Sequence, residues 1–295
     1  WWRNANVIMS VKKLFDLEGK VAVVTGSSKG IGKAIAEALA EFGAKVIVSS
    51  RSQEAVDAVA EEFKAKGYEA TGIACHVGDE DQRQALIQKT VALYGGVDIL
   101  VNNAATNPVF SPLEGIENNV FDKIMDVNVK ACFSFAKHCF PFMKEKKNGS
   151  IINIASVEGM KPSLGLGLYG VSKSALIMLT QSQASEWGKY GIRNNAIAPG
   201  PFPTKGAWDR LLPGDMAKKF DVKNRVPLKR VGEHQELANL AAFLMSDFSG
   251  YINGEVITID GGEWLKGAGQ FNLLEDIPAE MWDMLEMMIK AKKNK

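Results

Sequence analysis

The sequence has little of what marks secreted or metal-binding proteins. It contains only three cysteines, Cys75, Cys132 and Cys139, scattered over 295 residues. They are too few for a disulfide framework and too dispersed for a cluster of metal ligands. We therefore expect buried, reduced thiols, no bound metal and a cytoplasmic location.

The chain also lacks an excess of charge of one sign and any long apolar run. It has 35 basic and 34 acidic residues, with no long basic run before the final KAKKNK. This balance argues against nucleic acid or an anionic membrane as a partner. The runs VAVVT and IINIA are far shorter than the ~20 residues that a membrane-spanning helix needs. We expect a soluble protein.

What the sequence does contain is a regular alternation of two patterns. Segments with helical periodicity, such as 32–43 and 54–67, end in glycine and lie between short runs rich in Val and Ile. These runs, which we expect to be strands, are 20–25, 45–50, 69–75, 97–102, 150–156, 192–199 and 255–260. Continuously apolar strands fit a parallel sheet covered on both faces. The pattern predicts an α/β fold, a single Rossmann-type domain with a doubly wound parallel sheet.

Changes in composition suggest the boundaries of this domain. We expect the fold to occupy 14–262, after an N-terminal extension at 1–13 that takes no part in it. Residues 203–228 form a long connection rich in apolar side chains, which predicts a substrate lid, with packing helices as the alternative. A C-terminal extension follows at 263–295. Its apolar residues recur at the spacing of an amphipathic helix: Trp282, Leu285, Met288 and Ile289.

The first predicted strand leads directly into a glycine-rich turn, TGSSKGIGKAIAEAL. Gly26, Gly30 and Gly32 permit a tight bend and a close backbone approach, and amides at the start of the next helix favour a pyrophosphate. A turn that only packs helix on strand is the alternative. Its place after the first strand favours nucleotide binding.

A second motif lies in SLGLGLYGVSKSALIMLT, residues 163–180. Tyr169 and Lys173 are four residues apart, so on a helix they share one face, with Cβ atoms about 5–6 Å apart. A neighbouring cation lowers the pKa of a phenol, and a shift to about 7 requires roughly 4 kcal/mol. The pair is a candidate proton donor, with an exposed Tyr and a solvated Lys as the alternative.

Together these motifs resemble those of the short-chain dehydrogenase/reductase family. The similarity covers about 17–262 and includes, in the family's order, TGxxxGIG at 25–32, NNAA at 102–105, Asn128, Ser156 thirteen residues before Tyr169, Lys173, and PGPFPT at 199–204. It implies hydride transfer between a nicotinamide cofactor and a small-molecule carbonyl or alcohol. It also implies a homotetramer, with helices inside 117–142 and 168–188 at an interface.

The resemblance implies a role for each catalytic residue. Tyr169 would be the general acid, and Lys173 would lower its pKa and hold the nicotinamide ribose. Ser156 would orient the substrate oxygen, and Asn128 would connect Lys173 to solvent through water. Taken alone, Ser156 could be a strand-end turn residue and Asn128 a buried amide that satisfies backbone groups.

The resemblance also implies where the cofactor binds. The residues concerned are Gly26, Ser28, Lys29, Gly30, Ile31, Gly32, Arg51, Val77, Asn103, Ala104, Tyr169, Lys173, Pro199, Gly200 and Thr204. NAD users place an acid at the end of the second strand, where it binds the ribose 2′-hydroxyl. Here that strand ends in VIVSSRSQ, and Arg51 with Lys29 can bind a 2′-phosphate instead. We expect NADP(H), with solvated surface cations as the alternative.

Two features depart from the common family pattern. Many members have Asp where this chain has His76, so only Val77 of that segment is assigned to the cofactor site. In the NNAA segment, which does follow the family pattern, we expect Asn102 to brace neighbouring strands. Residues 185–211 and 260–282 resemble the 2,4-dienoyl-CoA reductase branch, which implies reduction of a conjugated C=C bond as a rival activity. The intact YGVSK favours carbonyl chemistry. A non-catalytic NADP-binding regulator is the other alternative.

Overall fold

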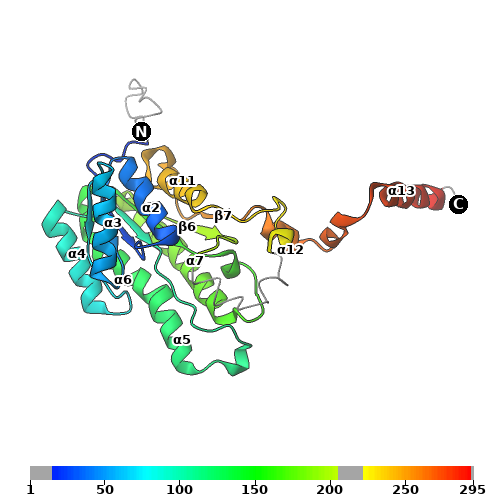
Figure 1. Ribbon diagram of the computed structural model, residues 1–295, viewed down its shortest axis with the longest axis horizontal. Helices are drawn as coiled ribbons and strands as arrows, with labels where there is room; N and C mark the ends of the chain where they lie inside the picture. The colour runs from blue at the N-terminus through cyan, green and yellow to red at the C-terminus, as the bar shows by residue number, and fades with distance from the viewer. Residues whose placement is uncertain (1–14, 205–221, 294–295) are drawn as a thin grey trace, which may run out of the picture.

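The computed structural model describes residues 15–204 and 222–293 (Figure 1). The predicted N-terminal extension and most of the predicted lid lie outside these residues. In the described part, seven parallel strands form one sheet in the order β3-β2-β1-β4-β5-β6-β7. The strands are β1 (Val21–Thr25), β2 (Lys45–Ser49), β3 (Ala70–Gly72), β4 (Ile99–Asn102), β5 (Gly149–Ile154), β6 (Ile192–Pro199) and β7 (Val256–Ile259). The predicted doubly wound α/β fold is confirmed.

Helices cover both faces of the sheet (Figure 1). The α-helices of the described residues are α2 (Gly30–Glu41), α3 (Gln53–Ala65), α4 (Glu80–Tyr94), α5 (Asn118–Met125), α6 (Ala131–Lys146), α7 (Gly167–Trp187), α10 (Val222–Arg225), α11 (His234–Met245), α12 (Glu263–Ala268) and α13 (Ala279–Lys293). Val24 packs in one core cluster with Ile35 of α2 and Leu237 of α11. Its neighbour Val23 packs in a second cluster with Phe135 of α6. Successive strand residues face opposite layers, which is why both are apolar.

A row of buried polar side chains joins the central strands. The Asn102 amide donates to Asn153 Oδ1 at 2.8 Å, which links β4 to β5. Asn153 donates in turn to Thr180 Oγ1 on α7 at 2.8 Å and to Asn194 Oδ1 on β6 at 3.2 Å. Asn102 therefore braces neighbouring strands, as expected. The network ties β4, β5 and β6 to one another and to α7.

The C-terminal helix α13 stands apart from the body of the protein (Figure 1). Trp282 is 49% exposed and Met288 56% exposed, so the apolar stripe of α13 is not buried within this chain. An isolated helix of this length is marginally stable in water. Among the described residues, no helix is long and apolar enough to cross a membrane.

Candidate active site

The sequence motifs meet at one edge of the sheet because the strands are parallel. The glycine turn, the NNAA segment and Ser156 directly follow β1, β4 and β5, which are neighbours in the sheet. The segment 199–204 follows β6, the next strand along. In open α/β sheets this edge is where ligands bind.

The glycine turn has a conformation that side chains would prevent. Gly26 and Gly30 have positive φ angles of 65° and 59°. A Cβ atom on Gly32 would lie 2.4 Å from both Asn103 Nδ2 and the Gly26 carbonyl oxygen. Asn103 holds this turn by donating to the carbonyl oxygens of Thr25, at 2.9 Å, and Gly26, at 3.1 Å. The NNAA segment thus packs against the glycine turn, with the Ala104 amide bonded to Thr25 Oγ1.

The start of α2 differs from the starts of its neighbours. Ser52 caps α3 and Asp79 caps α4, and both helices have an acid in the first turn. At α2, within the described residues, Lys29 makes no side-chain cap and the first turn holds no acid. The backbone amides at the start of α2, which lies between Ser28 and the partly buried Ile31, suit an anion. A glycine cradle followed by an uncapped helix start fits a dinucleotide phosphate.

The end of β2 is bonded directly to the glycine turn. The Ser27 amide donates to the Ser49 carbonyl at 3.0 Å, and the Ser49 amide donates to Ser27 Oγ at 2.9 Å. Arg51, two residues further on, is exposed, as is Lys29. Thr204 also approaches this turn, since a Cβ atom on Gly30 would lie 3.3 Å from its methyl group.

Ser156, Tyr169 and Lys173 lie together at the same edge of the sheet, two strands away from this turn. Ser156 precedes a 3₁₀ turn at Val157–Gly159, and its hydroxyl lies near enough to the Tyr169 phenol to lower the pKa of that group. Lys173 Nζ lies 5.5 Å from the centroid of the Tyr169 ring and donates to the Ile154 carbonyl, at the end of β5, at 2.6 Å. The spacing on α7 and the end of β5 bring the three side chains into one site.

Burial dominates the proton affinities in this site. It raises the pKa of Tyr169 to about 12, although the nearby Ser156 hydroxyl acts in the opposite direction. It also lowers the pKa of Lys173 to about 8. From the sequence we expected Lys173 to lower the Tyr169 pKa. The structure differs because desolvation penalises both charged forms. Tyr169 therefore keeps its proton at neutral pH, as a proton donor must.

We expect Lys173→Met to unfold at a higher urea concentration than the parent at pH 7. A buried ammonium whose pKa falls from 10.5 to about 8 destabilises the fold at every pH below about 8. This cost disappears as the pH rises past 10.5, where Lys is neutral in both states. The stability difference between variant and parent should therefore be about 2 kcal/mol smaller at pH 10 than at pH 7. A pH-independent difference would contradict this, and Lys89→Met, at an exposed position, serves as the control.

Asn128 lies in a π-turn at Asp126–Lys130, a feature frequent at functional sites. Its Oδ1 accepts from the Thr106 amide at 2.8 Å, and its Nδ2 donates to the Thr106 carbonyl at 2.9 Å and to Ser172 Oγ at 3.0 Å. Ser172 in turn donates to the Tyr169 carbonyl at 2.7 Å. The Asn128 side chain thus satisfies backbone groups and steadies α7. Sequence reasoning missed Ser172, whose only signal was its place inside YGVSK.

Two further predicted segments are held by their neighbours. Arg83 on α4 donates to the Val77 carbonyl, and His76 Nδ1 accepts from the Gly78 amide at 3.2 Å, so His76 folds back on its own loop. After Pro199, at the end of β6, Gly200 packs against the strand-end turn of β7. A Cβ atom on Gly200 would lie 2.6 Å from that of Asp260.

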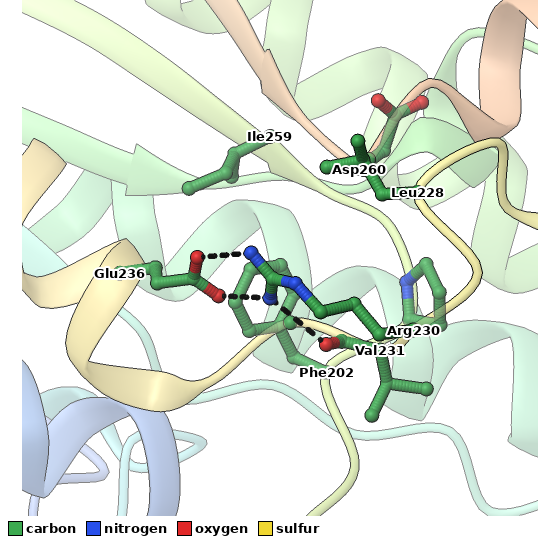
Figure 2. A pocket seen from close by; sticks show the side chains of 10 residues that line it. Phe202, Leu228, Arg230, Val231, Glu236, Ile259 and Asp260 are labelled. Atoms are coloured by element: carbon green, nitrogen blue, oxygen red, sulfur yellow. Dashed lines mark hydrogen bonds and ion pairs between the residues drawn. The ribbon is translucent and has the colours of Figure 1, made fainter. Parts of the chain in front are cut away.

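A pocket lies beside the segment 199–204, and none of Ser156, Tyr169 and Lys173 lines it. Figure 2 shows its lining residues. Arg230 crosses it, forming two hydrogen bonds with Glu236, at 2.6 and 2.7 Å, and one with the Val231 carbonyl. The Gly232 amide donates to the Pro201 carbonyl at 3.0 Å. These contacts hold the segment that follows β6, so we assign the residues of this pocket a structural role: they position the segment 199–204.

Known proteins are similar to this chain in sequence and in structure. The family model described as "Enoyl-(Acyl carrier protein) reductase" matches residues 26–263. Dehydrogenase/reductase SDR family member 4 of Homo sapiens is 41% identical over 246 residues, which cover 83% of this chain and 88% of that protein. Tropinone reductase-like 3 of Erythroxylum coca is 42% identical over 249 residues, 83% of this chain and 93% of that protein. A gluconate 5-dehydrogenase of Burkholderia cenocepacia, solved in complex with NADP and tartrate, has a TM-score of 0.81 at 34% identity, with 86% of this chain and 98% of that chain covered.

Proposed function

The chain belongs to the short-chain dehydrogenase/reductase family, and we propose that it is an NADPH-dependent enzyme that interconverts a carbonyl group and a secondary alcohol. Membership makes it an oxidoreductase that uses a nicotinamide cofactor. The finer proposal, with a ketone, an aldehyde or a 3-oxoacyl compound as substrate, rests on one observation. Ser156, Tyr169 and Lys173 lie together at the end of β5, at the same edge of the sheet as the glycine turn.

In the proposed reduction, Tyr169 donates its hydroxyl proton to the substrate oxygen. The nicotinamide, when bound, supplies the hydride for the carbonyl carbon. Ser156 Oγ orients the substrate oxygen toward Tyr169, and the Lys173 ammonium favours the negative charge that develops when the proton leaves. Asn128 and Ser172 position Tyr169 through α7. In the oxidation direction the same residues act in reverse, with Tyr169 as the base.

The residues of the glycine cradle fit the cofactor's pyrophosphate, and Arg51 with Lys29 supports NADP(H). Both cations are exposed near the turn, and neither has an ion pair with another described residue. The NADP in the similar gluconate 5-dehydrogenase adds support. Val77, Asn103, Ala104, Pro199, Gly200 and Thr204 complete the proposed cofactor site.

The rival proposal is reduction of a conjugated C=C bond in an acyl thioester. The matching family model, described as an enoyl reductase, favours it. Purified protein should therefore be tested with NADPH against ketones and a 2,4-dienoyl-CoA. We expect oxidation of NADPH with a ketone. Turnover of the dienoyl-CoA alone would favour the rival, and cofactor binding without any turnover would favour a regulator.

We propose a homotetramer, because apolar side chains on the helical surfaces remain exposed in the single chain. Phe121 of α5, Phe133 of α6 and Met178 of α7 are each at least 41% exposed. Light scattering on the full chain should give a tetramer, and a version that ends at Gly262 should form a weaker assembly because it lacks α13. Monomers with unchanged activity in both cases would refute this.

We also propose a substrate lid and a cytoplasmic location. Residues 203–228 are proposed to close over the substrate, with only 203–204 and 222–228 among the described residues. Cys75, Cys132 and Cys139 are buried free thiols, which supports a reducing compartment and hence the cytoplasm.

A further inference from the structure

Glu158 is a carboxylate inside the candidate site that the proposed mechanism does not use. It lies in the 3₁₀ turn at Val157–Gly159, and its amide donates to Ser156 Oγ at 3.1 Å. Its carbonyl oxygen faces α7 one residue after Tyr169, since a Cβ atom on Gly170 would lie 2.7 Å from it. The Glu158 backbone is thus held between Ser156 and the first turn of α7, next to Tyr169.

The rest of this turn is fixed against α7 as well. Ser174 Oγ donates to the Gly159 carbonyl at 2.6 Å. A Cβ atom on Gly159 would lie 2.8 Å from the Lys173 carbonyl carbon. Because the turn cannot move away from α7 without breaking these contacts, the Glu158 side chain starts from a fixed point beside the site.

The carboxylate of Glu158 has no compensating partner in the described structure. Its Oε2 is buried, and no described residue donates a hydrogen bond to it. The nearby lysines are engaged elsewhere, Lys161 with Glu263 at 3.1 Å and Lys173 with the Ile154 carbonyl. A buried, unpaired carboxylate oxygen is costly, and in native proteins such groups call for a functional reason.

The charge of Glu158 also reaches the reacting atoms. It raises the pKa of Tyr169, so its field acts at the hydroxyl that gives up the proton. A substrate oxygen bonded to that hydroxyl lies in the same field. A positive group on the substrate is attracted there and a negative group is repelled, more strongly than in water because the site is partly dry.

We propose that Glu158 determines substrate specificity: it favours carbonyl compounds or alcohols that carry a protonated amine near the reacting carbon and disfavours those that carry a carboxylate there. This inference rests on the proposed function of the site, because it assumes that the reacting group lies against Tyr169 and Ser156. It makes Glu158 a residue that selects the substrate, whereas the proton is moved by Tyr169.

The test uses three six-membered cyclic ketones that differ in charge: N-methyl-4-piperidone, tetrahydropyran-4-one and 4-oxocyclohexane-1-carboxylate. With NADPH at pH 7, we expect kcat/KM to be about tenfold higher for the cationic ketone than for the neutral one, and about tenfold lower for the anionic one. In Glu158→Gln the kcat/KM values for the three ketones should become similar. The change should arise mainly in KM for the two charged ketones, with little change for the neutral one. Glu186→Gln, at an exposed position of α7, should keep the parent pattern.

Two further readouts separate this inference from the proposed chemistry. Binding of the three rings to parent and variant, measured by saturation-transfer NMR without turnover, should follow the same order and lose it in Glu158→Gln. If the rings bind in that order but no ketone is reduced, the role of Glu158 is retained and carbonyl reduction is refuted. In alcohol oxidation, Glu158→Gln should move the acid limb of the pH profile to lower pH. If parent and Glu158→Gln show the same order of preference among the three ketones, the inference is overturned. It is also overturned if none of the three rings binds to either protein.

Discussion

Tyr169→Phe should lower ketone turnover by about 100-fold or more, the usual contribution of a positioned general acid. The substitution removes the hydroxyl group and keeps the ring beside Lys173. Cofactor contacts of the glycine turn are untouched, so NADPH should still bind. The loss should therefore appear in kcat and in kcat/KM alike.

The matched control is Tyr251→Phe, which removes the same hydroxyl from a fully exposed position. It should leave turnover unchanged. NADPH binding by Tyr169→Phe can be followed by fluorescence titration, which separates lost chemistry from lost folding. Unchanged ketone reduction in Tyr169→Phe would show that the proton comes from another group.

Arg51→Asp should shift the ratio of kcat/KM for NADPH over NADH toward NADH by roughly 10- to 1000-fold. It removes a cation at the end of β2, where Ser27 and Ser49 bond the strand to the glycine turn. It also introduces a carboxylate that repels a 2′-phosphate and can accept from a 2′-hydroxyl. The parent protein should prefer NADPH.

Lys89→Asp makes the same change of charge at an exposed position of α4 and should leave the ratio unchanged. This control separates a local contact from the general field of the protein. Initial rates with both cofactors, at constant ionic strength, provide the measurement. Equal use of NADH and NADPH by the parent would mean that Arg51 is only a solvated cation.

The strands, the doubly wound fold and the place of the site were accessible from the sequence because they depend on chain order and apolar patterning. Each predicted run contains a strand, and the motifs lie at strand ends. The length of the edge strand β3 was overestimated, since only Ala70–Gly72 is a strand. The Ile73 and Cys75 amides still donate to carbonyl oxygens in and just after β2. An edge segment needs less regular pairing than a central one, so periodicity marks its end poorly.

Features that depend on burial could not be predicted in this way. The spacing of Tyr169 and Lys173 shows that they share a helix face, but it does not show how deeply that face is buried, and depth decides both pKa shifts. The π-turn around Asn128 leaves no mark in the apolar pattern. Glu158 is visible near Ser156 in the sequence, whereas its lack of a described partner is visible only in three dimensions.

The assignment of carbonyl chemistry can be decided by following one hydrogen atom. The protein is incubated with NADPH carrying deuterium at the transferable position of the nicotinamide and with tetrahydropyran-4-one, and the product is examined by NMR. We expect one deuterium on the carbinol carbon of the alcohol, formed by the parent and at least about 100-fold more slowly by Tyr169→Phe. No deuterated alcohol, together with deuterium on a former alkene carbon when a 2,4-dienoyl-CoA is supplied, would contradict carbonyl reduction.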